Sequence, residues 1–454
     1  MKSFGVHVVV FAALIAFSSV AAQAEVFTLN DALSVAYETN PSLDSQRAGQ
    51  RATDENVAQA NANWRPQISV GGSYGYEGIH GGLGIPGTFP LHPLTDQLNV
   101  SEPIFRGGRT YAEIRKAKAT VRAGRAQLLN AEQSVLFDAV SSYMDVVRDE
   151  ATLRLRQNNV GVLQKQLDAT QEQFKVGELT RTDVAQSQAR LAGAQADLVT
   201  AQGQLAVSRS NFEHAIGRPA ETLESQPALP RLPPNEDGAI VIATSTNPVL
   251  IQAREEEKAA DYAVDDALGA LLPQVSVNGQ YQYSQGSLTS FGVGTQHITS
   301  VLGQITVPIY QGGAEESAVR QAKQLRSQAE LAIADTQRQV VDATRTAWQS
   351  FVTAQATIQS NRAQVDANQV AFDGVKQEQQ VGSRTILDVL NAEQELLNAQ
   401  VSVVVSQRDS YVAAYQLLAA MGLLTAKNLA LHVRLYDPLQ NYDDNAARWF
   451  GLGD

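Results

Sequence analysis

Apolar residues recur every seven positions along two long stretches of the chain. The large residues of the first stretch are Leu153, Val160, Leu167 and Phe174, and those of the second are Val184, Leu191, Leu198, Leu205 and Phe212. In the second stretch a small residue, alanine or serine, stands three places after each large one. A heptad with large and small seam residues is typical of closely packed coiled-coil helices. The other positions are mostly polar, which predicts a helical wall whose second face meets water.

A second pattern has a period of two and predicts β-strands. Its apolar members in the first half are Ile68, Val70, Gly72, Tyr74 and Tyr76, and in the second half Val301, Gly303, Ile305, Val307 and Ile309. We expect four strands, at about residues 66–77, 94–105, 273–284 and 298–309. Each has one apolar face and one small, polar face. Their length of about ten residues and the tyrosines at their ends are typical of strands that cross a bilayer.

The whole pattern occurs twice along the chain. "RPQISV" at residue 65 returns as "LPQVSV" at 272, "PIFRGG" at 103 as "PIYQGG" at 308, and "VGELTRTDV" at 176 as "VGSRTILDV" at 381. The sequence therefore predicts a duplicated unit: a first repeat at 25–226, a proline-containing linker at 227–239, a second repeat at 240–423 and a C-terminal segment at 424–454.

Each repeat is expected to contain two helical limbs of similar length. No proline interrupts residues 108–174, and at ~1.5 Å per residue such a helix runs roughly 100 Å. The stretch that returns, at about 182–216, is only half as long. We expect the helix at about 41–64 to stack on the end of the returning one and complete that limb.

The chain begins like an exported protein. Lys2, an apolar run at residues 6–17 and the sequence Ala22-Gln23-Ala24 are typical of a secretory signal peptide, predicted at 1–24. No later apolar run is long enough for a helix to span a bilayer, so any crossing must use strands. Cysteine is absent, which excludes disulfides and thiolate metal sites. A net charge of −12 without a dense basic tract disfavours nucleic acid as a partner.

No fragment of the sequence indicates an enzyme. The glycine-rich "GGLG" at 81–84 lies between two predicted strands and lacks the lysine of a nucleotide loop. His80 and His92 share that connector without the cluster of ligands that a metal site requires. No nucleophile with a base emerges from local spacing. We expect no catalytic site, no cofactor and no metal.

Four strands in one chain cannot close a membrane barrel, which requires at least about eight. The strands must therefore be shared between chains, and two, three or four copies fit that requirement. The main alternative is a periplasmic coiled-coil adaptor or scaffold protein without a pore. Long heptads and a signal peptide suit both, but four amphipathic strands do not suit an adaptor.

Taken together, the duplication and these motifs resemble the TolC family of outer membrane channels for efflux and type I secretion. The ending "LYDPLQNYDDNAARWFG" is similar to that of members serving type I secretion. The resemblance implies a mixed α and β membrane protein: a long α-helical barrel of coiled-coil hairpins joined to a transmembrane β-barrel shared by three chains. It implies a location in the outer membrane, with the helical part and the C-terminal segment at 424–454 in the periplasm. The implied partners are outer membrane lipid, a periplasmic adaptor and an inner membrane pump or ABC exporter.

Each "VG" motif is the expected turn of a helical hairpin, because glycine suits a tight reversal between helices. Two tips are predicted, at about 176–183 and 381–388. The resemblance implies that an adaptor contacts these tips, at Val176, Gly177, Glu178, Val381, Gly382 and Ser383.

The resemblance also implies a gate beside the second tip. Asp388 matches a carboxylate that narrows the mouth, and Arg384 is expected to reach Thr182 and Asp183 of the other hairpin. Two positions depart from the family pattern: Asn391 stands where a second acid is expected, and Gln379 where a closing tyrosine is often found. The competing interpretation is that Asp183 and Asp388 only cap the returning helices.

Overall fold

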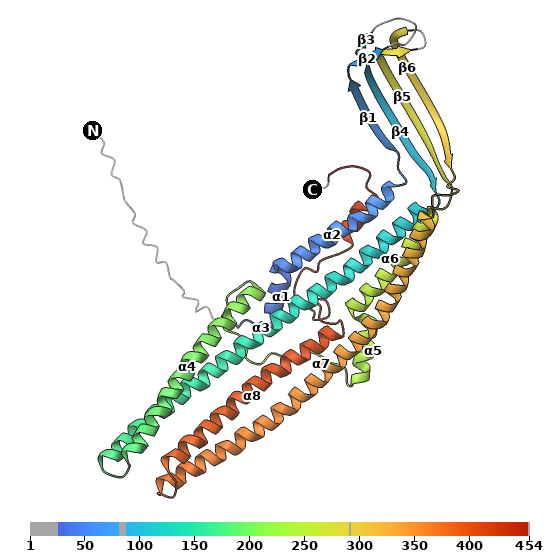
Figure 1. Cartoon of the computed structure of the whole chain (residues 1–454). Helices are drawn as coiled ribbons and strands as arrows, with labels where there is room; N and C mark the ends of the chain where they lie inside the picture. Colours follow the sequence, from blue (N-terminus) through green and yellow to red (C-terminus); the bar gives the residue numbers. More distant parts are fainter. Residues whose placement is uncertain (1–25, 81–87, 290–291, 453–454) are drawn as a thin grey trace, which may run out of the picture.

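The computed structural model describes residues 26–80, 88–289 and 292–452. The predicted signal peptide at 1–24 and the "GGLG" connector lie outside these ranges. Figure 1 shows a narrow sheet at one end of an elongated molecule and two long helical hairpins at the other. Within the described ranges, no helix combines the length and the apolar character that a membrane span needs.

Four strands form one antiparallel sheet in the order β1-β4-β5-β6. The strands are β1 (Gln67–Tyr74), β4 (Leu94–Arg106), β5 (Gln274–Thr289) and β6 (Gly292–Thr306). The connection between β1 and β4 contains a separate two-stranded antiparallel ribbon, made of β2 (Glu77–His80) and β3 (Thr88–Leu91). No pattern in the sequence predicted this ribbon. Its two strands are short and irregular in pattern, with Pro90 inside the second.

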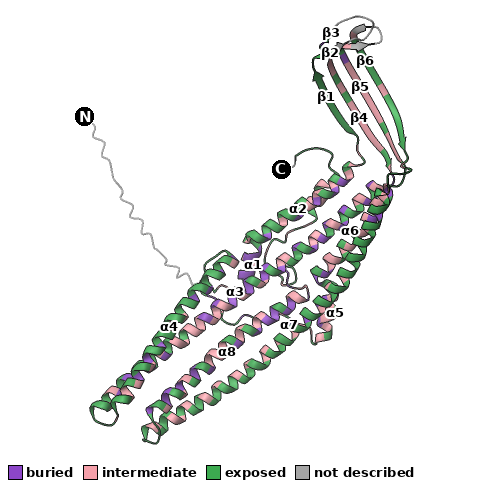
Figure 2. Cartoon of the chain, in the orientation of Figure 1, coloured by how far each residue is buried: buried purple, intermediate pink, exposed green. Residues whose placement is uncertain are grey.

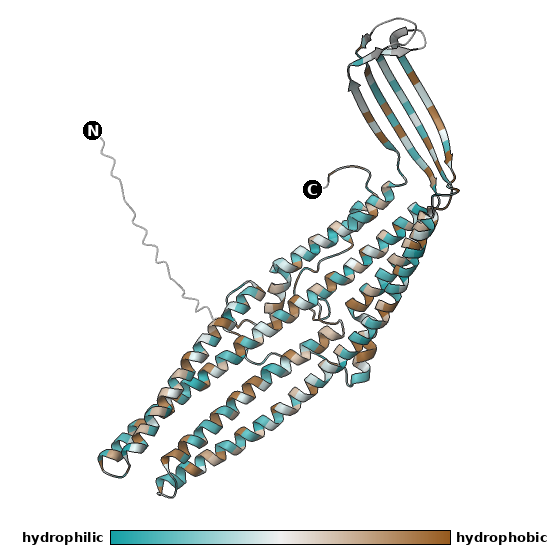
Figure 3. Ribbon diagram, in the orientation of Figure 1, coloured by the Kyte–Doolittle hydropathy of each residue, from teal (hydrophilic) through white to brown (hydrophobic). Residues whose placement is uncertain are grey.

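The register gives the sheet two different faces. Val70 pairs with Leu98, Leu98 with Tyr281 and Tyr281 with Thr299, so apolar and aromatic residues share one face. Figure 3 shows the resulting alternation of hydrophobic and hydrophilic residues along the strands.

The opposite face carries a ladder of amides and hydroxyls. The hydroxyl of Ser101 donates to Asn278 Oδ1 (2.8 Å), and Asn278 Nδ2 donates to Gln304 Oε1 (3.3 Å). One face of the sheet thus suits an apolar environment, and the other suits water.

The helices repeat one arrangement in both halves of the chain. The first half contains α1 (Leu29–Thr39), α2 (Pro41–Ala62), α3 (Arg109–Lys175) and α4 (Arg181–Ile216). The second half contains α5 (Glu236–Thr246), α6 (Pro248–Gly269), α7 (Ala314–Gln380) and α8 (Ile386–Ala420), and α9 (Gln440–Asn445) follows. The two long helices, α3 and α7, have 67 residues each.

The predicted stacking of short helices on the returning ones is confirmed. Asn40 caps α2, and its Nδ2 donates to the carbonyl of Ala215 near the end of α4 (3.3 Å). Asn247 caps α6 and donates in the same way to the carbonyl of Ala420 at the end of α8 (2.9 Å). In both halves an asparagine therefore joins two helices into one composite limb that lies beside a single long helix.

The main core lies midway along the helices, where α1, α3 and α4 meet the linker. Tyr143 and Phe212 are fully buried there. The Tyr143 hydroxyl donates to the carbonyl of Phe27 (2.8 Å) and accepts from the amide of Glu224 (2.9 Å). It therefore joins the segment before α1 and the segment after α4 to α3. Away from this core much of α7 stays exposed in a single chain (Figure 2).

Candidate functional site

Both hairpins reverse through the same turn. Gly177 and Gly382 adopt positive φ angles of 83° and 78°, a conformation that glycine enters without a steric penalty. The amide of Glu178 donates to the carbonyl of Gln173 (3.0 Å), and the amide of Ser383 donates to the carbonyl of Glu378 (2.9 Å). Each of these hydrogen bonds spans six residues, and each provides a donor for a backbone carbonyl in the last turn of its long helix, α3 or α7. The two "VG" motifs therefore encode the tips directly.

A capping box starts each returning helix. Thr180 and Asp183 exchange hydrogen bonds at the start of α4, and Thr385 and Asp388 do the same at the start of α8. The carboxylate of Asp388 accepts from the Thr385 amide (3.0 Å) and from its hydroxyl (2.8 Å). These bonds, with the charge of Arg384, lower the pKa of Asp388. Asp388 is therefore a helix cap that carries a full negative charge at neutral pH.

Arg384 contacts its own hairpin. Its Nε donates to Glu378 (2.9 Å), and not to Thr182 or Asp183 of the other hairpin, the partners expected from the sequence. A contact with those residues in a neighbouring copy stays a prediction. The physical reason is local: the turn brings Glu378 within reach, and the bond to Glu378 raises the pKa of Arg384. Thr182 is exposed at the first tip, and Gln379 is half-buried at the second.

The polar link between the two hairpins is made by other residues. Arg190 of α4 donates through Nη2 to Oδ1 of Asn391 on α8 (2.6 Å). Asn391 is the position where the family pattern led us to expect an acid. Arg190 was not among the residues predicted at the tips. Its one signal in the sequence was its position as a lone cation two turns after the first tip.

An apolar cluster accompanies this link. Leu390 of α8 is 2% exposed and packs with residues of the first hairpin. The buried members from α3 and α4 are Leu163, Leu167, Leu191 and Ala194. Because Leu390 precedes Asn391, one turn of α8 supplies both the apolar and the polar contact between the hairpins. We call Arg190, Leu390 and Asn391, with those four residues, the tip contact.

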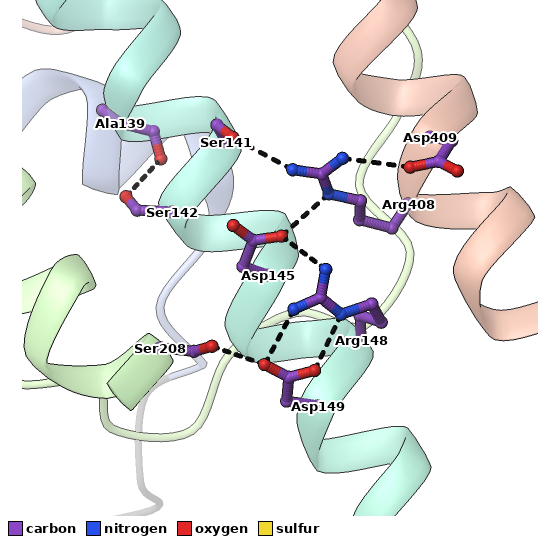
Figure 4. Close-up of polar contacts among 9 residues, drawn as sticks. All are labelled: Ala139, Ser141, Ser142, Asp145, Arg148, Asp149, Ser208, Arg408 and Asp409. Atoms are coloured by element: carbon purple, nitrogen blue, oxygen red, sulfur yellow. Dashed lines mark hydrogen bonds and ion pairs between the residues drawn. The ribbon is translucent and has the colours of Figure 1, made fainter. Parts of the chain in front are cut away.

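Farther from the tips, charged side chains join three helices (Figure 4). Arg148 of α3 pairs with Asp145 (2.9 Å) and Asp149 (2.7 Å), and Ser208 of α4 hydrogen-bonds to Asp149. Arg408 of α8 reaches across to Asp145 (2.8 Å). The network therefore joins the first hairpin to the second at mid-length, and the tip contact joins them near the turns.

A buried carboxyl lies just beyond the tip contact. Glu393 of α8 is 8% exposed, and burial raises its pKa to about 7, with Lys376 opposing the shift. The sequence signal was an acid at an otherwise apolar seam position, between Leu390 and Leu397. The charged form of Glu393 is costly in this environment.

We expect this carboxyl to make stability depend on pH. A folded pKa above the unfolded value means that folding favours the protonated form, so stability falls as pH rises from about 4.5 through about 7. Glu393→Gln should remove a penalty on the order of 2 kcal/mol at about pH 8, allowing for partial contact with water, and little at about pH 5.

Thermal unfolding of the two proteins across this pH range tests the expectation. Glu395→Gln, an exposed position on the same helix, is the matched control and should change the unfolding temperature little at any pH. A stabilisation by Glu393→Gln that is the same at both ends of the pH range would contradict it.

No group of three or more histidine, aspartate or glutamate residues arranged to hold a metal ion occurs within the described residues. The features that bear on function are the two tips, the tip contact and the sheet with its one apolar and one polar face.

Comparison with known proteins gives a consistent result. A family model described as outer membrane efflux protein matches residues 32–218 and 239–423. The chain is 35% identical over 425 residues to the outer membrane efflux protein BepC of Brucella suis biovar 1, covering 94% of this chain and 92% of BepC. It is 26% identical to the outer membrane protein TolC of Escherichia coli, covering 90% and 85%. The solved structure of the outer membrane protein VceC from Vibrio cholerae superposes with a TM-score of 0.75 at 21% identity, covering 87% and 96%.

Proposed function

Because this chain belongs to the outer membrane efflux protein family, a family of transport channels, we propose that three copies assemble into one exit duct that closes at the hairpin tips. The chain is an outer membrane protein with a periplasmic helical tunnel. The number of copies, the partners and the gate residues form the proposal. In this proposal the protein conducts cargo and performs no catalytic step of its own.

The observation that carries the proposal is the open sheet with two different faces. Within the described residues, β1 and β6 are the two ends of a four-stranded sheet. Unpaired strand edges cannot face lipid, because their backbone amides and carbonyls would lose water without gaining partners. Pairing β1 of one copy with β6 of the next removes every edge. Three copies then give twelve strands, an even number within the range of bacterial outer membrane barrels.

The helical wall supports the same assembly. The wall runs α4-α3-α8-α7, since α3 contacts α4 and α8, and α8 contacts α7. Its outer flanks carry exposed apolar side chains: Val199 and Val207 on α4, and Leu325, Leu331 and Val370 on α7. Neighbouring copies that meet along α4 and α7 would cover these residues. A helical barrel would thus continue the strand barrel into the periplasm.

We place the gate at the second tip and the tip contact. Asp388 supplies one negative charge per copy, so three would surround a narrow mouth and attract cations. Asn391 is neutral and bonds to Arg190, which makes it part of the link between hairpins. Asp388 is the carboxylate that we assign to the gate. Thr182, Asp183, Arg384 and Gln379 remain candidates for polar links between neighbouring copies.

Replacing the carboxylate tests its place in the gate. We expect Asp388→Ala to reduce cation selectivity and block by divalent cations in planar-bilayer recordings, because the ring of charge is removed. Asp183→Ala is the matched control. It removes the equivalent capping box from the first tip, at a similar cost of about 1 kcal/mol. Loss of a closing link at Asp183 would raise conductance, but selectivity should stay unchanged because we place no pore charge at the first tip. Equal effects of the two variants, or none, would remove Asp388 from the gate.

The exposed tips are the proposed docking surface for a periplasmic adaptor. Val176 and Val381 are 72% and 80% exposed, so each tip presents an apolar side chain to solvent. Gly177, Glu178, Gly382 and Ser383 complete the two turns. The proposed energy source is an inner membrane pump or ABC exporter that reaches the duct through this adaptor.

Crosslinking in living cells tests the partners. A photoreactive amino acid at Glu178 or Ser383 should capture an adaptor, and the identity of the associated pump separates drug efflux from type I secretion. The same residue type at Ser73, on the polar face of β1, is the control that should capture no periplasmic protein. A chain recovered as a soluble periplasmic monomer would contradict the duct.

A further inference from the structure

The end of the chain lies against the base of the sheet. Arg65 stands two residues before β1, and its guanidinium donates to the carbonyls of Arg448 (2.6 Å) and Ala447 (3.2 Å). The same guanidinium lies 4.8 Å from the centre of the Trp449 ring. Hydrogen bonds and a cation–π contact thus hold the chain end at the point where the first strand starts.

The segment before it is also fixed. Helix α9 packs along α2, and Asn441 donates to the carboxylate of Asp54 (3.3 Å). Asn61 of α2 donates to the carbonyl of Ala446 (2.8 Å), and the side chain of Tyr442 packs against the cluster around Val57. In Figure 1 this segment runs along α2 toward the strands. The position of residues 446–449 is therefore set by α2.

Three large apolar side chains at this end are mostly exposed in a single chain. Trp449 is 61% exposed, Phe450 86% and Leu452 fully exposed. Two cations, Arg65 and Arg448, stand beside them. Aromatic residues next to arginine are the composition found at membrane–water interfaces, where the rings sit among headgroups and the cations meet phosphates.

The place matches the composition. Ile68, the first lipid-suited residue of β1, is 67% exposed and follows Arg65 by three residues. At ~3.3 Å per residue, the apolar band begins within roughly 10 Å of Arg65. Trp449 and Phe450 therefore lie at the level where the sheet enters the bilayer, on the periplasmic side, because the helices extend from that end.

We propose that Trp449, Phe450 and Leu452 insert into the periplasmic leaflet of the outer membrane, with Arg65 and Arg448 against the phosphates of anionic phospholipids. This inference rests on the proposed duct, because the duct places the base of the sheet at that leaflet. The chain end then acts as a lipid anchor outside the barrel. It fixes the height of α2, and through α2 the tilt of the helical wall, relative to the membrane.

Tryptophan fluorescence tests this anchor, because the chain has only 3 tryptophans. Trp64→Phe with Trp348→Phe leaves Trp449 as the reporter in the full-length protein. The vesicles contain phosphatidylethanolamine with a minority of phosphatidylglycerol, brominated either near the headgroup or near the end of the acyl chain. Trp449 should lose most of its emission to the shallow bromine and less to the deep one.

Two controls separate this inference from the duct itself. A variant that keeps only Trp348, on the helical wall, should show no lipid quenching. A variant with all three tryptophans replaced and Val70→Trp added reports whether the sheet faces lipid.

The anchor is overturned if brominated lipid quenches the Val70→Trp reporter but does not quench Trp449. Quenching of Trp449 by a water-soluble agent alone would mean that it faces water. Quenching of Trp449 by neither agent would mean that a second copy covers it. Absence of quenching at Val70 would instead contradict the duct.

Discussion

Proline placed at either of two adjacent positions of β1, Val70→Pro or Gly71→Pro, is expected to abolish the assembled channel. Adjacent residues of an antiparallel strand point their backbone groups to opposite sides. One of the two amides therefore faces β4, and the other faces the edge where we place β6 of the next copy. Proline removes the donor in both cases. We expect each variant to lose the heat-resistant oligomer on gels and its place in the outer membrane.

The pair contains its own control. If β1 were a free edge, the proline whose missing amide points outward would be tolerated, as prolines are on the edges of soluble sheets. If one of the two proline variants behaves like the unmodified protein and the other does not, the edge of β1 is not shared with a second copy. That outcome would favour the alternative interpretation, a periplasmic scaffold protein without a pore.

Truncation of the tip contact is expected to open the periplasmic mouth. Leu390→Ala removes a side chain that is 2% exposed and packs mainly on the other hairpin. Such a change typically costs about 2–5 kcal/mol, and here the loss falls on the contact between hairpins. With Arg190→Ala added, the neighbouring hydrogen bond to Asn391 is lost as well. We expect a severalfold rise in single-channel conductance in planar bilayers.

The control for this opening is Val162→Ala on α3. Val162 is also an aliphatic residue at the level of the tip contact, but it is 46% exposed and lies outside both the tip contact and the flanks where we place neighbouring copies. It should leave conductance unchanged. If Leu390→Ala and Val162→Ala behave alike while both assemble, the tip contact does not hold the mouth closed.

The regular parts of this fold were predictable because periodic patterns encode them. The heptads of residues 184–212 predict the long limbs, and the alternation of Ile68, Val70 and Tyr74 predicts a strand. The glycines of the two "VG" motifs predict turns because only a positive φ closes them. The repeat of Asn-Pro at 40 and 247 aligns the halves, and the structure shows why: each asparagine joins two helices.

Contacts between elements were not predictable in this way. Arg384 was expected to cross to the other hairpin, yet Glu378 lies closer along its own turn. The link that does cross joins Arg190 and Asn391, 201 positions apart, and no local pattern pairs them. Glu393 reads as an interruption of an apolar seam, and its raised pKa follows only from the packing around it.

Covalent trapping of neighbouring strands tests the shared barrel most directly. The chain has no cysteine, so one cysteine in β1 at Gly71 and one in β6, scanned over Ser300, Leu302 and Gln304, form the only possible disulfides. At the matching register we predict that oxidation in membranes yields a covalent three-chain species, which reduction returns to single chains. Covalent species that end at two chains or extend to four, or no linkage at any register, would contradict the account.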